Sequence, residues 1–376
     1  MYMRFILGFT LAAVLSAAPP PDSKKMLADD RLLAAPLELK QAPGRHSTVF
    51  RGEKGRSGFN LHSYIAYHDG RYWAAWSSAM VHEEDPDQHI RYANSKDGHK
   101  WSESAVLAAD PDGPSGPKRW ITRGLFVEGG KLHALGALVE SAAYGNRGKG
   151  VVWENLKLMR FTWSGKEWTS AGVYADDCMN NFPAVRIAGM LSMPCRDRNM
   201  SVSYRISDSP ATGWKIVPIS NDQPFHRMDE PTVYEAADGT VQLIVRDGTR
   251  SGRLIRIVSR DKGKSWDLPV STNYPDATSK NFAARLSNGE YYLINNPSTA
   301  GRDPLAISFS ADGWVYDRPL ALRKNGPPAR LSARKSGSGS LQYPHAVEHN
   351  GSLWVIYSTN KEDIEISEFR LRELGL

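Results

Sequence analysis

A hairpin signal that recurs six times along the chain is the strongest constraint on its fold. Each copy has an apolar strand, a tight turn that ends in glycine, and a second strand rich in aromatic residues. The turn glycines lie 60, 59, 50, 50 and 62 positions apart, at Gly70, Gly130, Gly189, Gly239, Gly289 and Gly351. Such a repeat with several strands per unit is typical of a propeller blade, and the alternation of apolar and polar residues excludes helical repeats. The sequence therefore predicts an all-β protein, a six-bladed β-propeller of four-stranded antiparallel blades.

A second motif, SRDKGKSW at Ser259–Trp266, lies in the later part of such a unit. Related segments occupy the same place in other units, at Ser95–Trp101, Ser207–Trp214 and Ser310–Tyr316. The aspartate can accept hydrogen bonds from amides of its own turn, the glycine allows a positive φ, and the tryptophan packs between sheets. Recurrence at one position favours a structural role, so we do not expect Asp97 or Asp261 to be catalytic.

The first residues, MYMRFILGFTLAAVLSAA, combine an arginine, a short apolar run and a tail of small residues, as in a secretory signal peptide. We expect a signal peptide at 1–18, a linker and N-terminal approach segment at 19–57, and the propeller domain at 58–376. No later segment reaches the roughly 18 apolar residues that a membrane helix needs. The sequence therefore predicts a secreted or periplasmic protein without a membrane span.

The net charge of +6 is spread along the chain without a Lys/Arg tract. A nucleic-acid interface would need a clustered basic face, so we expect no nucleic-acid partner; a basic cavity that receives an acidic ligand explains the excess better. Cys178 and Cys195 could form a disulfide or stay reduced. The histidines lack the spacing of metal-binding motifs, and we expect a monomer with neither metal nor other cofactor.

The repeats resemble the Asp-boxes of the sialidase (neuraminidase) superfamily, and the likeness covers residues 58–371. Glu230 opens a strand and Arg246 closes the next, as in bacterial exo-sialidases, where the glutamate acts on a tyrosine nucleophile and the arginine binds the substrate carboxylate. Tyr343 begins the inner strand of the last unit, the place of that tyrosine. A phenol, with a pKa of about 10, needs an adjacent base. The resemblance implies a secreted exo-acting glycosidase that releases a terminal acidic sugar, with sialic acid as the first candidate.

The resemblance also implies a general acid in the loop HEEDPDQ that follows the first hairpin, with Asp87 preferred over Asp85. Several guanidinium groups bind a carboxylate better than point charges do. Arg302 lies in the sequential place of another family arginine, and two further arginines lie at hairpin ends. The predicted substrate-binding arginines are thus Arg123, Arg196, Arg246 and Arg302.

The likeness fails at the first family arginine, because counting back from Gly70 places Asn60 at that position. Histidines gather at the same strand ends and can transfer protons near neutral pH. Asn60, His62 and His345 are therefore candidate substrate contacts. Two alternatives stay open. One is a propeller polysaccharide lyase or non-sialic glycosidase that acts on uronic-acid glycans through His or Tyr; the other is a propeller that binds glycans without cleaving them.

Overall fold

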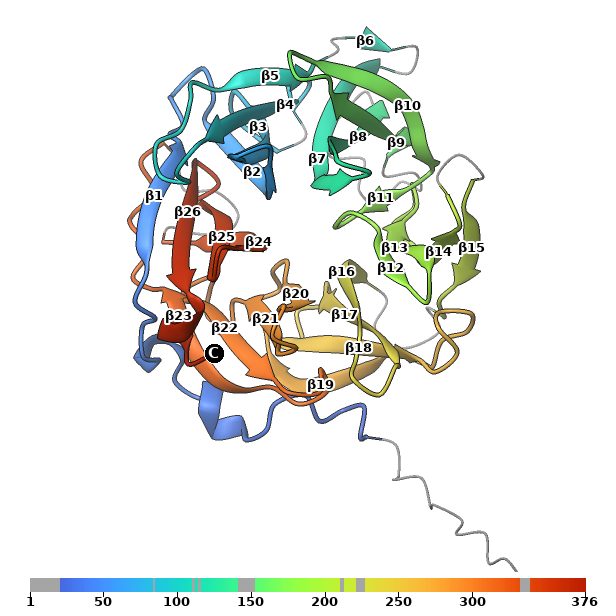
Figure 1. Cartoon of the computed structure of the whole chain (residues 1–376), viewed down its shortest axis with the longest axis vertical. Helices are drawn as coiled ribbons and strands as arrows, with labels where there is room; N and C mark the ends of the chain where they lie inside the picture. Colours follow the sequence, from blue (N-terminus) through green and yellow to red (C-terminus); the bar gives the residue numbers. More distant parts are fainter. Residues whose placement is uncertain are drawn as a thin grey trace, which may run out of the picture.

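Six antiparallel sheets stand around a common axis in the computed structural model (Figure 1). The structure describes residues 21–83, 85–109, 112–113, 116–140, 153–209, 213–220, 227–331 and 339–376. The predicted signal peptide at 1–18 lies outside these residues. The predicted all-β fold with six four-stranded blades is confirmed. In the part of the chain that is described, no helix has the length and apolar character needed to span a membrane.

Each blade runs from an inner strand near the axis to an outer strand at the rim. Blade 1 consists of β2 (Phe59–His68), β3 (Arg71–Ala79), β4 (His89–Ser95) and β5 (Ala105–Ala108). Blade 2 consists of β7 (Gly116–Glu128), β8 (Lys131–Glu140), β9 (Glu154–Trp163) and β10 (Trp168–Asp176), with the short β6 (Asp112–Gly113) beside β7. In blade 3, β11 (Met179–Asn180) and β12 (Val185–Ile187) both pair with β13 (Met190–Arg196), followed by β14 (Val202–Ser207) and β15 (Lys215–Pro218).

The second half of the ring is built in the same way. Blade 4 consists of β16 (Met228–Glu235), β17 (Val241–Asp247), β18 (Arg253–Ser259) and β19 (Val270–Pro275). Blade 5 consists of β20 (Phe282–Arg285), β21 (Tyr291–Asn295), β22 (Leu305–Ser310) and β23 (Asp317–Arg323). Blade 6 consists of β24 (Leu341–His349), β25 (Ser352–Thr359), β26 (Asp363–Arg370) and β1 (Arg45–Phe50). Short 3-10 helices are η1 (Asp30–Leu33), η2 (Pro36–Glu38) and η4 (Leu371–Leu374).

The two ends of the chain close the ring. The strand β1 pairs antiparallel with β26, from Arg45 opposite Glu368 to Phe50 opposite Ile364, and so becomes the outer strand of blade 6. The segment before β1 packs on blade 5, where the backbone amide of Ala28 donates to the carbonyl of Tyr316. The segment 19–57, expected to be a linker and N-terminal approach segment, therefore contributes β1 to blade 6 and packs on blade 5.

The turns that carry the SRDKGKSW-type motif are structural, as predicted. The Asp97 carboxylate accepts hydrogen bonds from the backbone amides of His99 at 2.8 Å and Lys100 at 2.7 Å. These bonds lower the pKa of Asp97 to about 2. Gly98 has a φ of +75°, and a Cβ there would lie 2.3 Å from the Trp354 ring of blade 6. The motif therefore forms a tight turn whose glycine lets two neighbouring blades meet.

Replacing this glycine should weaken the contact between blades 1 and 6. We predict that Gly98→Ala lowers the free energy of unfolding by about 2–5 kcal/mol, since it combines left-handed backbone strain with overpacking against Trp354. The matched control is Gly70→Ala, because Gly70 has a φ of +69° but no atom within 4 Å of its Cβ position. It should cost about 1–2 kcal/mol. Urea denaturation measures both, and equal losses would contradict the packing role.

Candidate active site

Four inner strands carry a β-bulge at the same end of the propeller. The pairing register shifts at Leu61/Tyr64 in β2, Thr122/Gly124 in β7, Asp229/Thr232 in β16 and Gln342/His345 in β24. A bulge bends its strand and re-aims a side chain. The residues at these bulges are His62, Arg123, Glu230 and Tyr343, and all four line one pocket. His62, Glu230 and Tyr343 have φ values of 53°, 48° and 62°, a strained conformation that is common at functional sites.

The pocket has a volume of about 220 Å³ and is strongly polar. Among the described residues that line it, seven cationic side chains face three carboxylates. The cations are Arg123, Arg196, Arg227, Arg246, Arg250, Arg302 and Lys361, and the carboxylates are Glu83, Asp229 and Glu230. The four predicted arginines thus converge, together with Tyr343, Glu230 and His62. The excess of positive charge would attract an anionic ligand.

Arg246 joins the two residues that the sequence analysis paired. Its Nη1 donates to Glu230 Oε2 at 2.7 Å and to Tyr343 Oη at 3.1 Å. The Tyr343 hydroxyl is also one of the groups that lower the pKa of Glu230. Each of these three side chains comes from a different strand, and Glu230 and Tyr343 belong to blades that are not neighbours. One guanidinium therefore fixes the mutual position of a phenol and a carboxylate.

Burial and neighbouring charges set the protonation of this pair. Burial alone would raise the pKa of Glu230, but Arg246 and Arg196 outweigh it and hold that pKa below its usual value. Burial, together with the charge of Glu230, raises the pKa of the Tyr343 hydroxyl above its usual value. At neutral pH the pair is therefore an ionised carboxylate beside a neutral phenol.

The other two arginines near this pair differ in their partners. Arg196 is ion-paired with Asp229, whose second oxygen lies 3.9 Å from Arg246 Nη1. Arg302 instead donates to neutral acceptors, namely the side-chain oxygen of Gln342 and, at 3.0 Å, the carbonyl of Thr278. The Arg302 guanidinium also lies 5.5 Å from the centre of the Tyr343 ring. Arg246 and Arg302 thus flank Tyr343 on adjacent blades, where they could bind a single carboxylate.

The loop 82–88 reaches the pocket with a residue other than those predicted. Asp87 accepts a hydrogen bond from the amide of Met80 at 2.6 Å, and Asp85 accepts one from the amide of His82 at 2.6 Å, so both stabilise the loop itself. Neither lines the pocket, whereas Glu83 does. The Glu83 carboxylate lies 2.7 Å from Lys361 Nζ and 3.6 Å from His62 Nε2.

The structure also places Asn60 and His345 outside the pocket lining. Asn60 is fully buried and donates to the carbonyls of Ser57 at 2.8 Å and Glu362 at 2.7 Å, so it ties the first blade to the last. His345 is buried, and its Nδ1 accepts a hydrogen bond from the backbone amide of Ile65 at 3.2 Å. Both side chains therefore form hydrogen bonds with backbone groups.

Asp229, Lys361 and Glu83 line the pocket although no sequence pattern marked them as site residues. Strand alternation would place Asp229 on the face opposite Glu230, and only the bulge brings both residues into the pocket. Lys361 lies in the turn between β25 and β26, where no motif marks it. Glu83 is adjacent to the aspartates that were chosen, and a loop sequence alone does not indicate which of its carboxylates points inward.

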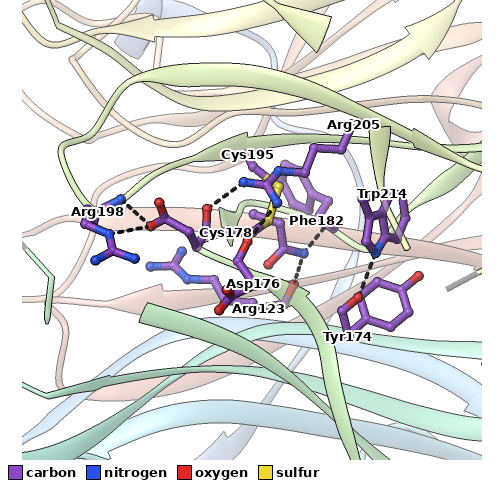
Figure 2. The surroundings of a disulfide bond; sticks show 11 residues. Arg123, Tyr174, Asp176, Cys178, Phe182, Cys195, Arg198, Arg205 and Trp214 are labelled. Atoms are coloured by element: carbon purple, nitrogen blue, oxygen red, sulfur yellow. Dashed lines mark hydrogen bonds and ion pairs between the residues drawn. A yellow bond between two sulfur atoms is a disulfide. The ribbon is translucent and has the colours of Figure 1, made fainter. Parts of the chain in front are cut away.

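A disulfide supports one wall of the pocket (Figure 2). Cys178 and Cys195, whose pairing the sequence left open, are bonded, and Cys195 lies opposite Asn180 in the β11–β13 pair. The Asn180 side chain donates to the carbonyls of Arg123 at 3.1 Å and Phe182 at 2.8 Å. The disulfide thus anchors the short strand that holds the backbone of Arg123.

Comparisons with known proteins agree with this architecture. A search of curated proteins found no match. Solved structures with the same fold include a protein of unknown function from Dyadobacter fermentans, with 17% identity, a TM-score of 0.67, and coverage of 86% of this chain and 97% of the other. A Hadza microbial sialidase has 16% identity, a TM-score of 0.65, and coverage of 85% and 68%. The intramolecular trans-sialidase of Ruminococcus gnavus has 13% identity, a TM-score of 0.64, and coverage of 88% and 98%. The model of the BNR repeat-like domain matches residues 70–356. The chain therefore belongs to the BNR repeat-like family and has the sialidase-like propeller fold.

Proposed function

We propose that this protein is an exo-acting glycosidase that releases a terminal acidic sugar through a tyrosine nucleophile. The observation that carries the proposal is the convergence of Tyr343, Glu230 and Arg246 in a pocket with excess positive charge. A volume of about 220 Å³ lies below the roughly 300–1,000 Å³ of drug-sized ligand sites, and it suits one sugar ring better than an internal stretch of polysaccharide. Sialidases named among the structural neighbours support the same reaction class.

The sugar carboxylate would bind between Arg246 and Arg302. Because Arg302 has neutral partners, it is available to an anion; Arg246 is shared with Glu230, so the substrate competes for its guanidinium. Competition raises the basicity of Glu230 when substrate is present. Glu230 then takes the proton of Tyr343, and Tyr343 Oη attacks the anomeric carbon as the bond to the leaving oxygen breaks. Water later cleaves the glycosyl–tyrosine bond and restores the phenol.

Glu83 would protonate the leaving oxygen after it takes up a proton from solvent, since its ion pair with Lys361 favours the ionised carboxylate in the resting protein. It lines the pocket from the loop in which an acid was expected, Lys361 holds it there, and His62 Nε2 lies 3.6 Å from its carboxylate. The same group could then deprotonate the water of the second step. His62 presents an uncharged imidazole, because burial lowers its pKa well below its usual value.

A lyase is the second candidate, and the position of His62 favours it. The His62 ring packs edge-on against that of Tyr343, with the centroids 5.3 Å apart. A neutral imidazole beside a phenol could remove the proton next to a uronate carboxylate that Arg246 neutralises. Such a reaction would yield an unsaturated sugar and would need no covalent intermediate.

An intact disulfide supports export, because disulfides persist in oxidising compartments. We therefore retain the proposal that the protein is secreted or periplasmic.

The first prediction concerns the nucleophile. With sialyl-lactose and a panel of uronic-acid glycans, Tyr343→Phe should lower sugar release by about 1,000-fold or more, since the variant lacks the attacking oxygen. Tyr292→Phe, which removes a buried hydroxyl from blade 5, should leave release unchanged. Release is measured by chromatography and unsaturated products by ultraviolet absorbance. Unsaturated products would establish the lyase, and unchanged release by Tyr343→Phe would contradict the proposal.

The second prediction tests whether Glu230 is ionised in the resting enzyme. Because its pKa is lower in the folded protein than the ordinary 4.5, the ionised carboxylate stabilises the fold above that pH, and the contribution disappears as the pH falls through the folded value. The advantage in unfolding free energy of the native protein over Glu230→Gln should thus be greatest above about pH 5 and shrink on acidification. Urea denaturation across pH 3–7 measures it, and an advantage that grows towards low pH would contradict the assignment.

The third prediction concerns the acid. Glu83→Gln should lower kcat by about 100-fold or more for natural glycosides, yet much less for aryl glycosides whose leaving group needs no proton. The matched control is Asp87→Asn in the same loop, which should affect both substrate types alike and modestly. If Asp87→Asn showed the leaving-group dependence and Glu83→Gln did not, the acid would be Asp87.

A further inference from the structure

The deep arginines of the pocket are not equally neutralised. Arg196 pairs with Asp229, and Arg246 pairs with Glu230 and approaches Asp229. Arg302 donates to an amide oxygen and a carbonyl. Within the described part of the chain, no carboxylate lies at ion-pair distance from Arg123. Among the buried arginines of the pocket, Arg123 and Arg302 therefore have no carboxylate at ion-pair distance in the described part of the chain.

Arg123 is buried as well as unneutralised. Arg123 is only 3% exposed, and its Nε and Nη1 atoms have no hydrogen-bond partner among the described residues. Burial lowers the pKa of Arg123, and the charge of Arg196 acts in the same direction. A buried charge without a partner is costly, by several kcal/mol. A fold that keeps a guanidinium in this state holds it ready for an anion that arrives from outside.

The position of Arg123 separates it from the proposed carboxylate clamp. Arg123 lies on β7 in blade 2, whereas Arg302 lies between β21 and β22 in blade 5. In a ring of six blades these two stand opposite each other, and Figure 1 shows β7 across the axis from β20 and β21. The same ligand ring can therefore meet one guanidinium on each side. A carboxylate held between Arg246 and Arg302 leaves Arg123 facing another part of the sugar.

The backbone at Arg123 is unusually well fixed. Asn180 holds its carbonyl, and the Cys178–Cys195 disulfide anchors Asn180 through β11. The hydroxyl of Tyr64, an electrostatic neighbour of Arg123, donates to the carbonyl of Asn181 at 2.6 Å and accepts a hydrogen bond from Lys280 Nζ at 3.0 Å. The Nε and Nη1 atoms of Arg123 remain without a hydrogen-bond partner among the described residues. This preorganisation lowers the entropic cost of binding an anion at that point.

We propose that the sugar bound in this pocket carries two anionic groups: a ring carboxylate between Arg246 and Arg302, and a second oxyanion, a sulfate ester or another carboxylate, on Arg123. The inference deepens the proposed function and rests on its carboxylate clamp. Arg123 is then the residue that determines specificity for doubly charged sugars. Among the described residues, seven cationic side chains and three carboxylates line the pocket, and one substrate carboxylate would not neutralise the remaining positive charge.

Equilibrium binding to the Tyr343→Phe variant tests this without any turnover. The probes are glucuronate with one carboxylate, its 2-sulfate and 3-sulfate, and glucarate with two carboxylates, all titrated calorimetrically at fixed ionic strength. We expect at least one doubly charged probe to bind tenfold or more tightly than glucuronate. A preference for the sulfates identifies a sulfate ester, and a preference for glucarate identifies a second carboxylate.

The preference should depend on Arg123. In Arg123→Gln, affinity for the preferred probe should fall at least tenfold more than affinity for glucuronate, whereas Arg302→Gln should weaken both alike. Equal affinity for singly and doubly charged probes, or an equal loss of both in Arg123→Gln, would overturn the inference. If Arg123→Gln does not fold, Arg123→Lys serves instead, because lysine keeps the charge but cannot form bidentate hydrogen bonds. An undiminished preference of that variant for doubly charged probes would also overturn the inference. The binding preference survives even if Tyr343 proves not to be a nucleophile, so the two proposals fail separately.

Discussion

The site depends on the hydrogen bonds that the Arg246 guanidinium donates to both Glu230 and Tyr343. This guanidinium brings a carboxylate from blade 4 and a phenol from blade 6 within hydrogen-bond distance of one group. Without Arg246, burial of both side chains would be unfavourable, because the ionised Glu230 needs a counter-ion and the Tyr343 hydroxyl needs a hydrogen-bond partner. The same group is where a substrate carboxylate would compete. In the proposed mechanism, substrate binding and activation of the nucleophile would therefore be coupled through one side chain.

Bulges in the inner strands make this meeting possible. A regular propeller strand would alternate its side chains between the two faces of the blade, and each bulge instead turns one residue towards the axis. The repeated architecture thus supplies the same position in four blades, and the residue found there differs in each: His62, Arg123, Glu230 and Tyr343. The fold is a repeat, and the chemistry comes from the differences between its copies.

Much of this could be predicted from the sequence, for reasons that are local. Turn glycines and Asp-box turns mark the blades because backbone conformation and short-range hydrogen bonds determine them, and Glu230 and Arg246 lie on one hairpin. Other features depend on three-dimensional detail. The sequence made both Asn60 and His62 candidate contacts, and the bulge between Leu61 and Tyr64 determines that His62 lines the pocket and Asn60 does not. Likewise, Glu83 lines the pocket, whereas Asp85 and Asp87 accept hydrogen bonds from backbone amides.

Identification of the atom that attacks the sugar tests the central claim most directly. The protein would be incubated with activated fluorinated derivatives of N-acetylneuraminic acid and glucuronic acid, which slow the second step, and then digested for mass spectrometry. The account predicts a glycosyl adduct on the peptide that contains Tyr343, and fragmentation should place it on the tyrosine. An adduct on Glu230 or Glu83, or turnover of these compounds with no adduct at any time point, would contradict it.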